Sequence, residues 1–158
     1  DAKVGREGSP MPGGVEPVAD ERGGLLGYLA HQRLVLRIAA YGLTDDQARA
    51  TPTPSTLSVG GLIKHAGFVE RVWMDNVRQR ESPSGRDAYE EHFRLLPGEA
   101  LESVIEVYGQ AGAETARHAG HADTIREAID GATAFPLMAA AEGWPATDWL
   151  QPGRAPRS

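Results

Sequence analysis

Apolar residues recur every three or four positions in three long stretches of the chain, which is the spacing of one face of an α-helix. The stretches cover residues 21–41, 58–79 and 98–130. The apolar positions of the first two are Leu25, Leu29 and Leu36, followed by Leu62, Ala66, Val69 and Trp73. No part of the sequence alternates apolar and polar residues as a half-buried strand requires. The pattern predicts an all-α domain, an up-and-down bundle of four helices or of three long ones.

Residues that favour helix ends support these boundaries. Asp20 can accept hydrogen bonds from the first free amides of the first helix, and Gly42 is suited to end it. A short helical turn begins at Thr44 and stops before Pro52, and Ser58 can cap the second long helix. We therefore expect the first two long helices to be joined by a short helical connection.

The C-terminal third of the chain allows two interpretations. Gly109 and Gly112 interrupt the third apolar pattern, but each glycine costs a helix only about 1 kcal/mol. The stretch can be one long helix or two helices with a tight turn between them. Beyond it, Phe135, Trp144 and Trp149 lie in a segment rich in proline and glycine. This segment is predicted to lie across the bundle and to bury its aromatic rings.

The 158 residues suffice for one domain with a real core. Residues 1–19 are rich in glycine and proline and are predicted to form a disordered leader, with Met11 as an alternative natural start. Residues 151–158 are predicted to be a disordered tail, which leaves 20–150 as a single helical domain.

The charge balance restricts the partners. Sixteen basic and 22 acidic side chains give a net charge of −6, which disfavours nucleic acid and anionic lipid. The longest apolar run, residues 135–141, is too short to span a bilayer, and there is no cysteine for a disulfide or a thiolate site. We expect a cytoplasmic protein whose partners are small molecules, with a homodimer as an open possibility.

Three histidines and one glutamate have metal-ligand spacing. Glu114, His118 and His121 are separated by four and three residues, so on a helix their side chains leave from one face on consecutive turns. His65 on the second helix is the natural further donor. Burial as hydrogen-bonded core histidines is the competing interpretation, and the clustering favours a metal site. Nitrogen donors with at most one carboxylate favour zinc, nickel or another divalent transition ion.

The other polar candidates are expected to lie outside this site. His31 and His92 are predicted to be surface residues, whereas Trp73 is predicted to belong to the core. The charged side chains expected at the surface are Glu70, Arg71, Glu99, Glu102 and Asp123.

Several motifs resemble the DinB-like superfamily of metal-binding helical bundles. The resemblance is closest to its actinobacterial branch, which includes mini-circle proteins and mycothiol S-transferase-like enzymes. The motif Glu-Thr-Ala-Arg-His-Ala-Gly-His-Ala-Asp at 114–123 is the most specific part of it. The other matching stretches are 20–22, 25–36, 42–44, 54–58, 61–65, 69–70, Trp73, 126–127 and 143–144.

The resemblance implies a thiol-dependent enzyme that holds a divalent metal, commonly zinc or nickel. His65 matches the first ligand of the family. Glu114 and His118 match two positions, four apart, that are usually both histidine, and His121 falls where a polar residue often lies. Either Glu114 or His121 could therefore complete the ligand set.

One departure from the family pattern concerns the region before Glu114. Relatives have several tens of residues between the third helix and the histidine-bearing fourth, whereas here Tyr108 is followed almost at once by Glu114. We expect a metal-dependent transferase of a low-molecular-weight thiol onto an electrophile, in a shortened bundle. Its ligands would be His65, His118, His121 and Glu114, with Glu114 alternatively the general base. The competing hypotheses are a noncatalytic or degenerate binding or dimerisation module and a truncated sequence.

Overall fold

The computed structural model describes residues 17–81, 91–109, 116–148 and 150–153. Every regular element within these ranges is an α-helix, so the prediction of an all-α bundle is confirmed. The helices are α1 (Glu21–Ala39), α2 (Asp45–Arg49), α3 (Val59–Val77), α5 (Leu101–Gly109), α6 (Ala116–Asp130) and α7 (Ala134–Glu142). None of them is long and apolar enough to cross a membrane.

The predicted capping residues begin the first three helices. The Asp20 carboxylate caps α1 by accepting a hydrogen bond from the Gly23 amide at 2.7 Å. Thr44 and Gln47 form a reciprocal capping box at the start of α2, and Ser58 caps α3 in the same way as Asp20 caps α1. Gly42 has a φ of 69° in the turn after α1, a left-handed conformation that favours glycine.

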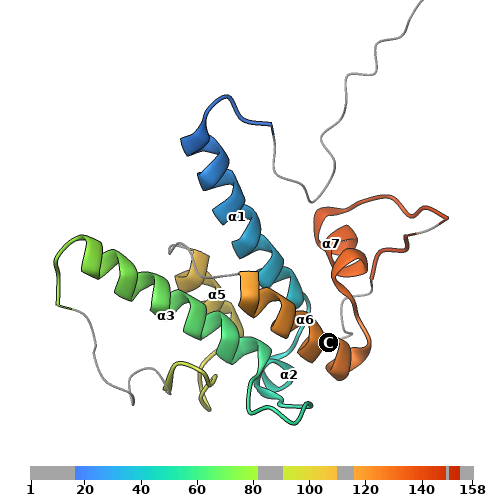
Figure 1. Ribbon diagram of the computed structural model, residues 1–158. Helices are drawn as coiled ribbons and strands as arrows, with labels where there is room; N and C mark the ends of the chain where they lie inside the picture. The colour runs from blue at the N-terminus through green and yellow to red at the C-terminus, as the bar shows by residue number, and fades with distance from the viewer. Residues whose placement is uncertain (1–16, 82–90, 110–115, 149, 154–158) are drawn as a thin grey trace, which may run out of the picture.

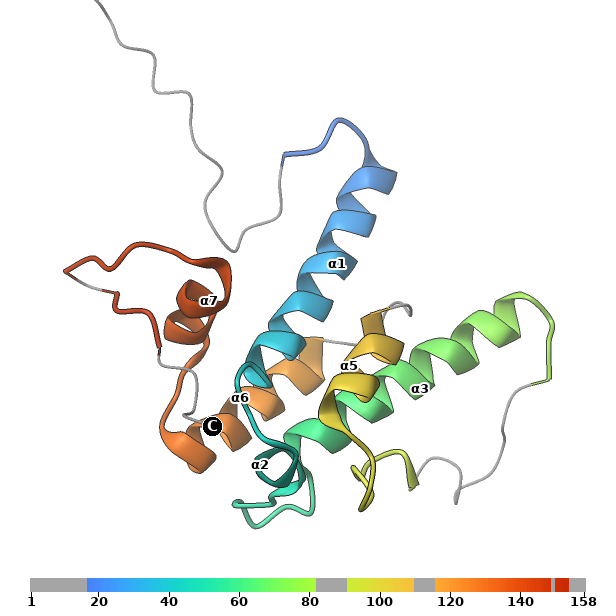
Figure 2. The same ribbon diagram turned by 180° about the vertical axis from the view of Figure 1, so that it is seen from behind.

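The long helices α1 and α3 converge near α2 and diverge toward their other ends (Figure 1). Helices α5 and α6 lie on opposite sides of this pair, as the two opposite views show (Figure 2). Helix α5 packs against α3, whereas α6 packs mainly against α1 and also touches α3; α7 packs against α1. The two halves of residues 98–130 are therefore separate helices with different packing partners, which decides between the two interpretations of this stretch.

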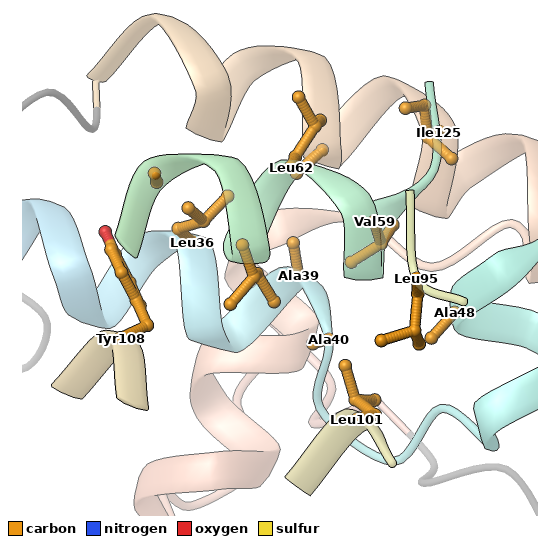
Figure 3. Close-up of a cluster of buried hydrophobic side chains, with 13 residues drawn as sticks. Leu36, Ala39, Ala40, Ala48, Val59, Leu62, Leu95, Leu101, Tyr108 and Ile125 are labelled. Atoms are coloured by element: carbon orange, nitrogen blue, oxygen red, sulfur yellow. The ribbon is translucent and has the colours of Figure 1, made fainter. Parts of the chain in front are cut away.

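Buried side chains from the four central helices and their connections form the main core (Figure 3). Leu36 of α1, Leu62 of α3 and Tyr108 of α5 are fully buried, and Ile125 of α6 lies with them. The residues labelled in Figure 3 are Leu36, Ala39, Ala40, Ala48, Val59, Leu62, Leu95, Leu101, Tyr108 and Ile125. Burial of this apolar surface holds α1, α3, α5 and α6 together.

A fully buried arginine links α6 to the end of α1. The Arg126 Nη1 atom donates to the carbonyl oxygens of Ala39 at 3.0 Å and Tyr41 at 2.7 Å. Its Nε atom donates to Asp130 at 2.9 Å. Burial opposes ionisation of Asp130, but hydrogen bonds from Arg126 and the Ala132 amide and the charge of Arg126 outweigh it and lower the Asp130 pKa. Arg126 thus satisfies carbonyls that a helix end leaves without intrahelical partners.

Three predictions for α1 and α3 are wrong, two of them because the helices diverge. Trp73 is 58% exposed and does not join the core, and Leu25 is 61% exposed. Leu25 belongs to the N-terminal part of α1 and Trp73 to the C-terminal part of α3, and these are the ends at which the two helices diverge (Figure 1). Glu70, predicted to lie at the surface, is only 1% exposed and lies 3.8 Å from Arg33 Nε of α1.

The segment after α6 also differs from the prediction. Residues 134–142 form helix α7, which ends at Gly143 in a left-handed conformation (φ 70°). Phe135 is 64% exposed, whereas Trp144 packs against a second small core around Ile38 and Leu137. Trp149 lies outside the described residues. The segment that carries Phe135 and Trp144 is therefore partly helical, and of these two rings only that of Trp144 packs against the core.

Candidate metal centre

His65 of α3 and His118 of α6 face each other where these helices meet. Their ring centroids lie 5.2 Å apart with an interplanar angle of 87°. His65 is only 7% exposed, and the Nδ1 atoms of both rings are buried. Within the described ranges the Nδ1 atom of His65 has no hydrogen-bond partner. A buried imidazole nitrogen of this kind beside a second imidazole fits one side of a nitrogen-ligated metal site.

An aromatic wall that the sequence did not reveal closes one side of the pair. Phe93 stacks on the His65 ring with centroids 3.6 Å apart, and His92 stacks on Phe68 at 3.8 Å. His92 is half-buried here, so its prediction as a surface residue is wrong. The aromatic pair at 92 and 93, in an otherwise polar stretch, is the signal that could have identified this wall.

His65 is held in its neutral form. Burial is the main cause, and like charge on His118 and His92 adds to it, so that the pKa of His65 falls from 6.5 to about 4. Near neutral pH the His65 ring is therefore uncharged, and one of its two nitrogens keeps a free lone pair. This is the form of histidine that binds metal ions.

The lowered pKa of His65 predicts a pH-dependent stability. Between pH 6.5 and about 4 the unfolded chain binds a proton at this side chain and the folded chain does not. The free energy of unfolding is expected to fall, as the pH drops through this window, by on the order of 3 kcal/mol from this group. Urea unfolding at several pH values, with chelator present, measures it.

The matched control is His65→Gln, which cannot titrate. Its free energy of unfolding should fall less over the same pH window than that of the original chain. Equal slopes in the two proteins would contradict the assignment to His65.

A glycine places the aromatic wall against α3. The carbonyl of Phe93 approaches Gly61 so closely that a Cβ there would collide with it. The same segment is fixed by Glu99, which accepts hydrogen bonds from Lys64 Nζ at 2.8 Å and from the Leu96 amide at 2.7 Å. Burial opposes ionisation of Glu99, but these two bonds and the charges of Lys64 and His92 outweigh it and lower its pKa. Glu99 is thus half-buried and paired, and the prediction of an exposed charge is wrong.

Replacing Gly61 with alanine is expected to displace Phe93 and to destabilise the fold by about 2–3 kcal/mol, because the added methyl group meets backbone. NMR is the direct readout: the His65 ring protons should lose the shift caused by the stacked Phe93 ring. Gly120→Ala on α6 is the matched control, since its Cβ would meet nothing within 4 Å. Unchanged His65 shifts in Gly61→Ala would contradict the prediction.

The other predicted ligands are placed differently. His121 is exposed on α6, three residues after His118. Glu114 lies outside the described residues, in 110–115. Within the described part of the chain, no three histidine, aspartate or glutamate side chains are grouped as a metal site requires. The structure therefore brings together His65 and His118 from the predicted set.

Two further candidates are half-buried. Asp123 of α6 was expected to be a solvated charge, but burial raises its pKa. His31 is half-buried on α1, where a surface position was expected.

Comparison with protein families supports the resemblance inferred from the motifs. The family model described as mycothiol-S-transferase matches residues 24–114, more than half of the 158-residue chain. The chain belongs to this family and, with it, to the DinB-like superfamily. The matched region includes His65 and ends before His118. No match was found among curated proteins or among solved structures.

Proposed function

We propose that this protein is a metal-dependent thiol S-transferase that joins a low-molecular-weight thiol of the mycothiol type to an electrophile. The observation that carries this proposal is the buried, neutral His65 beside His118, in a chain of the mycothiol S-transferase family. Family membership supports the reaction class, and the histidine pair supports a divalent ion. The structure and the family together favour zinc or nickel over magnesium or calcium, because the donors are nitrogens.

His65 and His118 would hold the ion, with Glu114 or His121 as the next ligand. When bound, a divalent cation lowers the pKa of a thiol and so favours the nucleophilic thiolate. Phe93 fixes the orientation of the His65 ring by stacking and keeps water from one of its faces. The Glu114 carboxylate, if it is not a ligand, would accept the thiol proton. The sulfur then forms a bond to the electrophilic carbon as the leaving group departs with its electron pair.

Metal analysis combined with a conjugation assay tests this proposal. The purified full chain, without an affinity tag that binds metal, should contain about one divalent ion per chain. Mycothiol transfer to a fluorogenic alkylating electrophile should stop after chelation and return when zinc or nickel is added. Full transfer after complete chelation would overturn the proposal, as would protein that never binds either ion.

A noncatalytic dimerisation module is the second candidate. It is favoured by the exposed apolar side chains on the diverging parts of α1 and α3, namely Leu25, Leu26, Tyr28, Trp73 and Val77. Such side chains often mark a protein interface. Light scattering after size exclusion, with and without chelator, separates the two functions: a dimer that persists without metal, in protein without transferase activity, would support the module.

A further inference from the structure

A groove of about 560 Å³ lies between α1 and the C-terminal half of α3, with Val107 of α5 at its edge. Four arginines line it, Arg33 from α1 and Arg71, Arg78 and Arg80 from α3 and its end. Among the described residues, Asp75 is the one acidic residue in its lining. The groove is therefore basic in a chain whose net charge is −6. Such a local excess of one charge attracts ligands of the opposite sign.

Three of these arginines are available for a ligand. Arg33 lies beside the buried Glu70, so that its charge is partly balanced. Arg71, Arg78 and Arg80 are exposed and form no ion pair with any residue in the described ranges. Arg71 lies over the Phe68 ring at 5.7 Å, a contact that leaves its N–H groups able to donate.

The helix dipole accounts for only part of this arrangement. Cations stabilise the C-terminal end of a helix within its last turn, which explains Arg78 and Arg80 just after α3. Arg71 lies well before that turn, so the dipole gives no reason for its position. Its place in the groove lining is consistent with a role in binding.

The groove also has an apolar part and a lateral extension. Leu26, Leu29, Met74 and Val107 line it beside the arginines. A smaller cavity of about 250 Å³ between α3 and α5 shares Gly67, Arg71 and Val107 with it. The two spaces therefore adjoin at Arg71. A ligand could place a charged end at the arginines and an apolar end against the leucines and Met74.

We propose that this groove binds a small amphipathic organic anion. A carboxylate or phosphate head would accept hydrogen bonds from Arg71, Arg78 and Arg80, which suit planar and tetrahedral oxyanions. The volume is that of a small-molecule site, which favours such a ligand over a macromolecule. Val107 of α5 lines the groove, and the described residues of α6 do not; α5 and α6 lie on opposite sides of the α1–α3 pair (Figure 2). The proposal rests on the arginines and not on the histidine pair, so its test requires neither a bound metal ion nor thiol transfer.

Isothermal titration of the full chain with octanoate, octyl phosphate and uncharged octanol tests the proposal. One or both anions should bind with a dissociation constant of about 0.1–1 mM, and octanol at least about 10-fold more weakly. The anion that binds more tightly identifies the head group. Anion binding should weaken with added salt because the arginines attract the head group electrostatically. Equal binding of octanol, or no binding of either anion, would overturn the proposal.

Substitution of the arginines locates the site. Arg71→Gln and the double variant Arg78→Gln/Arg80→Gln should each weaken anion binding at least about 10-fold, because each removes charge-assisted hydrogen bonds. Arg22→Gln, at an exposed position in the first turn of α1, removes the same charge and should leave binding unchanged. Circular dichroism confirms that each variant folds.

Vesicles distinguish a free ligand from a lipid surface. Phosphatidylglycerol vesicles should not retain the protein at physiological salt. Retention on vesicles without binding of free octanoate or octyl phosphate would overturn the small-molecule assignment in favour of a membrane surface. Unchanged anion binding in Arg71→Gln and in the double variant would place the ligand outside this groove.

Discussion

Replacing His65 with alanine is expected to remove the bound metal ion and to lower thiol transfer at least about 100-fold. His65 is the buried partner of the His118 ring, and its neutral nitrogen is the donor that the proposed site requires. The metal content of the purified variant, measured by mass spectrometry, checks the first effect, and the conjugation assay checks the second. His118→Ala should have the same effect, because the two rings would share one ion.

His31→Ala is the matched control for this prediction. It removes a half-buried histidine from α1, outside the pair, and should keep both metal and activity. Variants of Glu114 and His121 then decide which of the two completes the ligand set. Replacing a ligand should weaken metal binding, whereas replacing a general base should slow thiol transfer and leave the metal bound. Full metal content in His65→Ala would contradict the ligand assignment.

Replacing Arg126 with methionine is expected to lower the free energy of unfolding by about 3–5 kcal/mol. The substitution leaves the Ala39 and Tyr41 carbonyls without their arginine donor and Asp130 without its cation. Methionine fills much of the same volume but donates no hydrogen bond. Urea unfolding near neutral pH measures the change.

Glu127→Met serves as the control, since Glu127 is the exposed neighbour of Arg126 on α6. It should change the free energy of unfolding by no more than about 0.5 kcal/mol. A loss below about 1 kcal/mol in Arg126→Met would show that water replaces the lost hydrogen bonds.

The helices that begin with a local signal were predictable from the sequence. Asp20, Thr44 and Ser58 cap their helices through contacts within one turn, so neighbouring residues suffice to place these starts. The exposure of Trp73 and Leu25 was not predictable in this way. Periodicity identifies the apolar face of a helix, but the angle between two helices decides how much of that face is covered.

The candidate site was likewise predictable from the sequence only in part. The histidine spacing predicted a shared site, and the structure brings His65 and His118 together. The stacking of Phe93 on His65 was not predicted, because it depends on the path of a distant segment past Gly61. The buried Glu70 likewise lies beside Arg33, which belongs to another helix. Spacing within one helix is readable from sequence, whereas contacts between segments require the fold.

The bonds of Arg126 also bear on the order in which the chain folds. The hydrogen bond to Tyr41 joins residues 85 positions apart, so the chain must close a long loop before it can form. Contacts of such sequence separation slow folding relative to local helix formation. The helix that Arg126 fixes to α1 is the one that carries His118. Pairing of the two histidines is therefore expected to follow loop closure, as a late event on the folding pathway.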